Sequence, residues 1–178
     1  VNGAPVTAGE TGWWTDRSLR TILLDPARLQ VGKNEITLVC AYDEEHPGLE
    51  SAFLLGEFGV RVSGATAMMT ARPETLKIGD WTRQGLAFYG GNVRYAATVR
   101  RPRVRKGDRL VVRVPAYAGT AVRVLVDGRA AGVVGWEPHE VDITELMTGP
   151  TARVEIEIIG HRRNSHGPFH WTAPYPVW

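Results

Sequence analysis

The chain has 178 residues, of which 43% are hydrophobic, and this length and composition suffice for one large β-sandwich or two small ones. Its 21 Lys and Arg residues nearly balance its 19 Asp and Glu residues, so no net field favours nucleic acid or an anionic membrane as a partner. No apolar run approaches the roughly 18 to 20 residues that span a bilayer, and the single cysteine, Cys40, excludes an internal disulfide and leaves a secreted, periplasmic or cytoplasmic location open.

The first predicted feature is a hairpin turn. In Val1-Asn2-Gly3 a β-branched residue precedes an Asn-Gly pair, the strongest short signal for a two-residue turn between strands. We therefore expect the chain to start at the end of a strand whose beginning is missing.

Short runs rich in Val, Ile, Leu and Tyr follow, and Gly, Pro, Asp or Asn residues separate them, as is typical of β-strands. The predicted strands are 19–24, 35–42, 52–62, 92–100, 109–114, 121–126, 140–143 and 153–159. A single helical turn is predicted at 142–147, where Asp142 or Thr144 caps it and Gly149-Pro150 stops it. This pattern predicts an all-β antiparallel sandwich.

The last predicted strand alternates strictly between charged and aliphatic residues. Glu155 and Glu157 share one face of it, and Val154, Ile156 and Ile158 share the other. We therefore interpret the two glutamates as a solvated face of the sheet rather than as catalytic acids.

An internal repeat indicates two related sandwiches. The order strand, tight turn, strand, aromatic loop, strand, connection and strand begins at Val1-Asn2-Gly3 and returns at Val126-Asp127-Gly128. The predicted domains are a partial jelly roll at 1–62, a connection at 63–85 and a complete sandwich at 86–178.

The second copy carries a recognisable succession of motifs. A strand ends in Val126-Asp127-Gly128, a loop holds Trp136 and Pro138, and the strands Val141-Asp142-Ile143-Thr144 and 154–159 follow. This succession resembles the galactose-binding-like jelly rolls that form the sugar-binding domain of family 2 glycoside hydrolases and of rhamnosidase-like enzymes. The resemblance covers residues 86–160, and residues 1–42 as a half-copy.

Three further segments, 49–60, 79–91 and 163–170, look like the C-terminal region of large bacterial hydrolase-like proteins. The resemblance implies a jelly-roll accessory domain of a carbohydrate-active enzyme. In such enzymes the catalytic acid and nucleophile belong to a separate barrel, for which this chain has no room.

Candidate acids and metal ligands are weak in this sequence. Glycoside hydrolysis needs two carboxyl groups across the scissile bond, and Glu50 and Asp80 are the acids to inspect first, but we assign no catalytic residue. His161, His166 and His170 lack the cysteines or carboxylates that would complete a zinc site, so neither metal nor cofactor is expected.

Aromatic residues beside polar ones are the best candidates for glycan contact, because sugar rings stack on aromatic faces while amides and acids take the hydroxyls. Asp80, Trp81, Gln84 and Tyr89 occur together, followed by Gly90-Gly91, which leave room for a ligand. The full set of candidate ligand-binding residues is Asp80, Trp81, Gln84, Tyr89, Trp136, His139, Asn164 and His170, with Glu50, Trp13 and Trp14 as further candidates. The alternative is structural: Asp80 caps a turn and Trp81 seals a junction.

The basic run 100–106 contains Pro102 and is followed by Gly107, so it is interpreted as a solvated hairpin connection and not as a nucleic-acid site. Three function classes remain open: a non-catalytic accessory domain, an autonomous carbohydrate-binding module, and a structural or interaction domain without ligand. The expected partners are a carbohydrate and the catalytic domain of the same parent chain, with no nucleic acid and no membrane.

Overall fold

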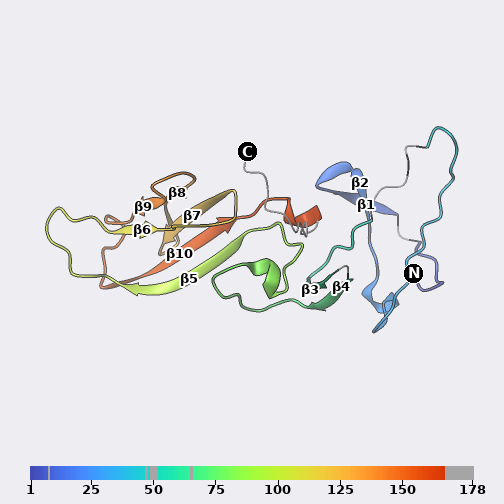
Figure 1. Cartoon of the computed structure of the whole chain (residues 1–178), viewed down its shortest axis with the longest axis horizontal. Coiled ribbons are helices and arrows are strands. Elements are labelled where there is room, and N and C mark those ends of the chain that lie inside the picture. Colours follow the sequence, from blue (N-terminus) through green and yellow to red (C-terminus); the bar gives the residue numbers. More distant parts are fainter. Residues whose placement is uncertain (8, 47, 49–51, 65, 167–178) are drawn as a thin grey trace. The chain divides into compact units, whose positions relative to one another are not determined.

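The computed structural model describes residues 1–7, 9–46, 48, 52–64 and 66–166 (Figure 1). Strands make up 35% of it and short 3-10 helices 6%, with no α-helix among the described residues. All paired strands run antiparallel, apart from one isolated parallel bridge. The prediction of an all-β, antiparallel protein is therefore confirmed.

The chain divides into two compact units, Val1–Phe53 and Leu54–Trp178. The first unit holds the hairpin β1 (Glu10–Trp14) and β2 (Asp16–Ile22), followed by the 3-10 turn η1 (Pro26–Arg28). The predicted Asn-Gly turn is present: Asn2 and Gly3 have φ angles of 50° and 78°, and the Ala4 N–H donates to the Val1 carbonyl at 2.9 Å.

The predicted strand 35–42 is wrong for this structure. No described strand pairs with it, and Leu38 and Val39 are 69% and 93% exposed. Its first residue is anchored, because Asn2 bonds both the backbone N–H and the carbonyl of Glu35, and its last residue, Tyr42, lies with its ring 4.9 Å from that of His46. The segment has the alternation of a strand but no described neighbour against which to form a ladder.

The second unit is built on a four-stranded antiparallel sheet. Its strands in spatial order are β5 (Val93–Arg100), β10 (Thr151–Ile159), β7 (Ala121–Val126) and β8 (Arg129–Val134). β7 and β8 are joined by Asp127-Gly128, whose φ angles of 47° and 76° match the turn that best fits the twist of a hairpin. In Figure 1, β5 borders the sheet and β10 lies beside it.

A second layer covers one face of this sheet and completes the core. It consists of β6 (Val111–Arg113) and β9 (Glu140–Asp142), and a Cβ added at Gly132 of β8 would lie 3.0 Å from Val141. Val122, Val124 and Val126 of β7 are fully buried in this core. The core comprises Trp81, Val93, Val114, Val122, Val124, Val126, Val134, Val141, Ile143, Met147, Ala152 and Ile158.

The remaining described elements of this unit are the hairpin β3 (Phe58–Ser63) and β4 (Thr66–Ala71), and the 3-10 turns η2 (Trp81–Gln84) and η3 (Asn164–His166). The Val60 N–H donates to the Gly85 carbonyl at 2.7 Å, which ties the hairpin to η2. Strand β4 was not predicted, since it lies in the stretch interpreted as a connection. Leu76 and Leu86 flank η2 and pack against the core.

The predicted turn after β9 is capped by Asp142. Its carboxylate accepts bonds from the Thr144 N–H at 2.9 Å and the Thr144 hydroxyl at 2.6 Å, and the Met147 N–H closes the turn on the Ile143 carbonyl. The Thr144 bonds, with further help from Arg109, hold the pKa of Asp142 at about 2.

This pKa predicts how stability depends on pH. Because the folded-state pKa of Asp142 lies below its unfolded value, its contribution is fully present above about pH 4 and disappears as the pH falls towards 2. Asp142→Asn should therefore be less stable than the parent at pH 6, and the two melting temperatures should converge near pH 2. Thermal unfolding across this range is the measurement, with the exposed Glu44→Gln as control. A difference that stays constant with pH would refute the assignment.

Candidate functional site

Four connecting segments meet at one end of the four-stranded sheet. The register pairs Ile158 with both Val93 and Val122, and Val122 with Val134, so β5 begins where β10 ends, and β7 begins where β8 ends. We call this the loop end. The segments there are 86–92, 114–120, 135–139 and 160–166.

Three glycines bring two of these segments into backbone contact. A Cβ added at Gly160 would collide with the carbonyl oxygens of Gly90 and Gly91, and one at Gly90 would lie 3.0 Å from the His161 carbonyl oxygen. Gly90-Gly91 therefore make room for the chain itself, not for a ligand. This close approach requires glycine on both sides.

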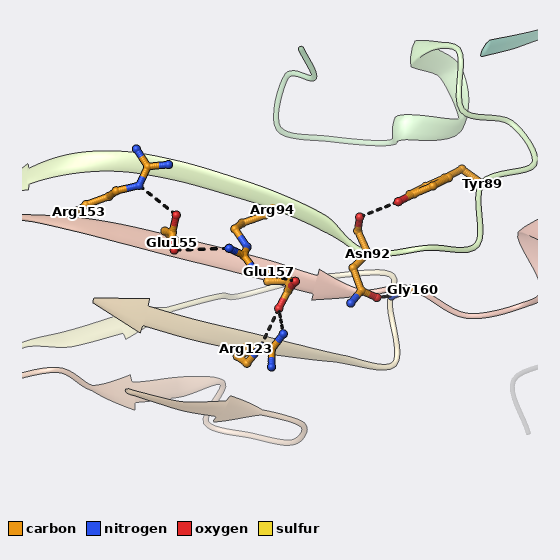
Figure 2. Close-up of polar contacts among 8 residues, drawn as sticks. All are labelled: Tyr89, Asn92, Arg94, Arg123, Arg153, Glu155, Glu157 and Gly160. Carbon is orange, nitrogen blue, oxygen red and sulfur yellow. Dashed lines mark hydrogen bonds and ion pairs between the residues drawn. The ribbon is translucent and has the colours of Figure 1, made fainter. Parts of the chain in front are cut away.

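The polar side chains beside these glycines hold the loop end together (Figure 2). The Tyr89 hydroxyl donates to the Asn92 carbonyl at 3.0 Å, and the Asn92 side-chain oxygen accepts from the Gly160 N–H at 3.2 Å. The Asn164 amide donates to the Tyr89 carbonyl at 3.4 Å. The structure thus brings together two predicted site residues, Tyr89 and Asn164, that lie 75 positions apart in the sequence.

Two other predicted residues, Trp136 and His139, lie at the opposite border of the loop end. The Trp136 side chain is 84% exposed, whereas the His139 ring packs edge-on against Tyr117 with ring centroids 5.5 Å apart. The Val114 N–H donates to the His139 carbonyl at 2.9 Å, and the Tyr117 hydroxyl donates to the Val134 carbonyl at 3.4 Å. An exposed indole therefore projects from a braced loop. β5 and β8 are three strand spacings, or about 14 Å, apart, so this loop and Tyr89 lie at opposite borders of the sheet.

The side chains of Asp80 and Gln84 bond to residues of their own loop, and the side chain of Trp81 is buried. Asp80 caps η2 by accepting the Thr82 N–H at 2.9 Å. The Gln84 amide bonds both the N–H and the carbonyl of Lys77, at 2.8 and 3.0 Å. Trp81 is only 9% exposed and packs in the core, so it offers no open ring face for stacking.

Glu155 and Glu157 are not solvated, which corrects the expectation from their alternation. They are 7% and 6% exposed, because three arginines from β5, β7 and β10 lie over them (Figure 2). Arg123 Nε lies 2.7 Å from a Glu157 oxygen, and Arg94 lies 3.2 Å from the other. The Arg123 bond lowers the pKa of Glu157 against the opposing effect of burial, and Arg94 adds to the lowering.

A groove runs along β5. Its volume is about 1010 Å³, and its walls come from β5, from residues 56–58 and from residues 72–78. Tyr89 and Tyr95 line it, together with apolar side chains such as Phe58 and Leu76. The Tyr95 hydroxyl donates to the Lys77 carbonyl at 3.3 Å, and burial raises the pKa of this phenol.

The other candidates do not join the loop end. Trp13, 55% exposed, and Trp14, whose ring lies 5.3 Å from that of Phe53, belong to the first unit. Glu50 and His170 lie outside the described residues. Within the described parts of the chain, no three His, Cys, Asp or Glu side chains gather as a metal site.

Sequence reasoning missed Tyr117 and Asn92. Tyr117 lies in a loop with Pro115 and Gly119 on either side, between two predicted strands, and this single aromatic in a turn-rich stretch was the available signal. Asn92 carried no signal, since its role depends on the distant Gly160.

No family model matches this chain, and a search of curated proteins finds no match. No helix in the described residues is long and apolar enough to cross a membrane.

Proposed function

We propose that this chain is an accessory β-sandwich region of a carbohydrate-active enzyme, without catalytic residues of its own, that contacts glycan through the loop end of its second unit. The observation that carries this proposal is the Trp136 indole, 84% exposed on a loop that His139 and Tyr117 brace. A large aromatic ring left open on a positioned loop is the surface that the apolar face of a sugar ring needs.

The layered arrangement supports a jelly-roll sandwich of the galactose-binding-like kind. The sheet β5-β10-β7-β8 lies against the pair β6-β9, and connecting segments from both layers meet at the loop end. Binding sites on such scaffolds are commonly formed by loops that a rigid framework positions. Fold analogy alone does not assign a ligand, so the proposal depends on Trp136.

A role in support of a catalytic domain fits better than capture of long polysaccharides. Among the described tryptophans, Trp13 and Trp136 are more than half exposed, and they belong to different units, so neither unit presents a described platform of several tryptophans. The buried carboxylates Glu155 and Glu157 are paired with arginines, which suits a structural role and not proton donation.

Substitution of Trp136 tests the proposal. Trp136→Ala should weaken glycan binding by about tenfold or more, as expected for loss of an aromatic anchor, and should leave the melting temperature unchanged because the side chain is exposed. The measurement is a screen of the parent on a broad glycan array, followed by calorimetric titration of both proteins with a hit.

Val133→Ala is the matched control, since Val133 is 65% exposed and lies nearby in the same strand-loop segment. Absence of any hit for the parent, or equal affinity of parent and Trp136→Ala, would remove the glycan role from this loop.

A further inference from the structure

Strand β5 presents a free hydrogen-bonding edge. The Arg101 N–H donates to the Pro150 carbonyl at 2.8 Å, and in an antiparallel ladder only alternate residues bond to a given neighbour. Residues 93, 95, 97 and 99 therefore bond to β10. The outward N–H and C=O groups belong to Arg94, Ala96, Thr98 and Arg100, and no described strand pairs with them.

The groove of about 1010 Å³ follows this edge. Residues 93 to 97 of β5 all line it, and so do Val154 and Ile156 of the neighbouring strand β10, although alternate side chains of β5 point to opposite faces of the sheet. The groove therefore lies over the apolar face of β5 and β10 and reaches the edge of β5, where Arg94 and Ala96 line it. Its far wall carries Phe58, Leu76 and Ile78, so an added strand would find backbone partners on one side and apolar side chains on the other.

The chain itself contains a segment suited to such an edge. Segment 35–42 alternates like a strand, pairs with no described strand, and exposes Ile36, Leu38 and Tyr42 by 52%, 69% and 68%. Exposed apolar residues on an extended, unpaired segment favour association with another edge.

We propose that segment 35–42 of a second copy of this chain adds to the β5 edge as an antiparallel strand. One register aligns the apolar face of segment 35–42 with the apolar face of β5. With Glu35 opposite Arg100, the face shared by Ile36, Leu38, Cys40 and Tyr42 meets Val99, Ala97, Tyr95 and Val93 in turn. Because Asn2 already bonds the Glu35 N–H and carbonyl, the ladder hydrogen bonds join residues 37, 39 and 41 to Thr98, Ala96 and Arg94, and Glu35 meets Arg100 through its side chain alone.

The opposite charges of Glu35 and Arg100 favour this register over registers shifted by two residues. Arg100 is exposed and enters no ion pair among the described residues, and Glu35 is likewise exposed. A shift by two residues in one direction places Glu35 opposite Pro102, and in the other opposite Thr98. Segment 35–42 of one copy and the β5 edge of the other are different surfaces. The contact therefore either closes as a reciprocal two-fold dimer or continues as an open chain of copies.

Disulfide trapping tests the register. Cys40 is the only cysteine of the chain and is exposed. Opposite Tyr95 it occupies a non-hydrogen-bonded pair, whose Cα atoms lie about 4.5 Å apart, within the roughly 4.4–6.8 Å that a disulfide spans. Under mild oxidation Tyr95→Cys should give a dimer linked through residues 40 and 95, identified by peptide mass. Val99→Cys, on the same face but opposite Ile36, should not form the corresponding link.

Association in solution gives an independent readout. Analytical ultracentrifugation over a concentration series should show self-association of the parent. Thr98→Pro should abolish it, since the Thr98 N–H points to the free edge and is not needed by β10. Glu35→Arg and Arg100→Glu should each weaken association about fivefold, and the double variant should restore it.

Three outcomes would overturn the proposal: a strictly monomeric parent, unchanged association of Thr98→Pro, or failure of the charge swap to restore binding. A disulfide formed within a single chain would exclude a second copy as the occupant of the groove.

Discussion

Trp81→Ala is expected to lower the free energy of unfolding by about 3–5 kcal/mol, the cost of truncating a buried aromatic side chain. Trp81 is 9% exposed and belongs to the buried core, against which Leu76 and Leu86 pack. For a chain of this size each kcal/mol corresponds to roughly 2–4 °C, so the melting temperature should fall by about 10 °C. Denaturation by urea and by heat measures both quantities.

Two further variants make this result specific. Trp81→Phe should cost much less than Trp81→Ala, because it retains most of the ring volume and removes an indole N–H that is buried without a described hydrogen-bond partner. Trp136→Ala removes the same side chain from an exposed position and should leave stability unchanged. If Trp81→Ala melted like the parent, the core position of this residue would be wrong.

Gly160→Ala should disrupt the loop end. A Cβ at this position would collide with the carbonyl oxygens of Gly90 and Gly91, which are backbone atoms and cannot rotate away. Separating the two segments would break the Gly160–Asn92 hydrogen bond and weaken the bond from the Thr120 hydroxyl to the Gly160 carbonyl. We expect a loss of about 1–3 kcal/mol or more, as in other overpacked sites.

Hydrogen exchange of individual amides shows where Gly160→Ala disrupts the structure. In Gly160→Ala the amides of 90–92 and 160–165 should exchange faster than in the parent, beyond any general loss of stability. Gly135→Ala is the matched control, because Gly135 lies in a neighbouring loop, has no atom within 4 Å of an added Cβ, and does not have a positive φ. Equal behaviour of the two variants would contradict the close backbone contact.

Strands β5, β6, β7, β9 and β10 were predictable because their local pattern and their final environment agree. In β7, Val122, Val124 and Val126 alternate with outward residues, and burial of the three valines follows that alternation. The Asp127-Gly128 turn and the Asp142 cap were predictable for the same reason, since each depends on residues within a few positions.

Segment 35–42 and strand β4 show where local pattern fails. Segment 35–42 has the composition of a strand, but a strand needs a neighbour, and sequence alone does not reveal whether one is present. β4 is exposed along most of its length, so its Met-rich sequence carries no alternation, and its pairing with β3 decides its structure.

The sequence predicted several residues of the candidate site, but not whether each of them is buried or exposed. Trp81 and Trp136 both lie in turn-rich segments, yet Trp81 is part of the buried core and Trp136 is exposed, a difference that depends on tertiary packing and not on the local pattern. Glu155 and Glu157 were placed correctly on the face opposite the aliphatics. Their burial could not be foreseen, since Arg94 and Arg123 arrive from strands that lie 63 and 34 positions before Glu157 in the sequence.

The position of β10 affects how the protein folds during synthesis. β10 lies between β5 and β7, although it is the last of the four strands to leave the ribosome. At roughly 5–20 residues per second, several seconds separate the appearance of β5 from that of its partner. During this interval β5 and the β7-β8 hairpin expose unpaired edges, and the β5–β10 ladder must close a long stretch of chain. The four-stranded sheet can therefore be completed only after Ile159 has emerged.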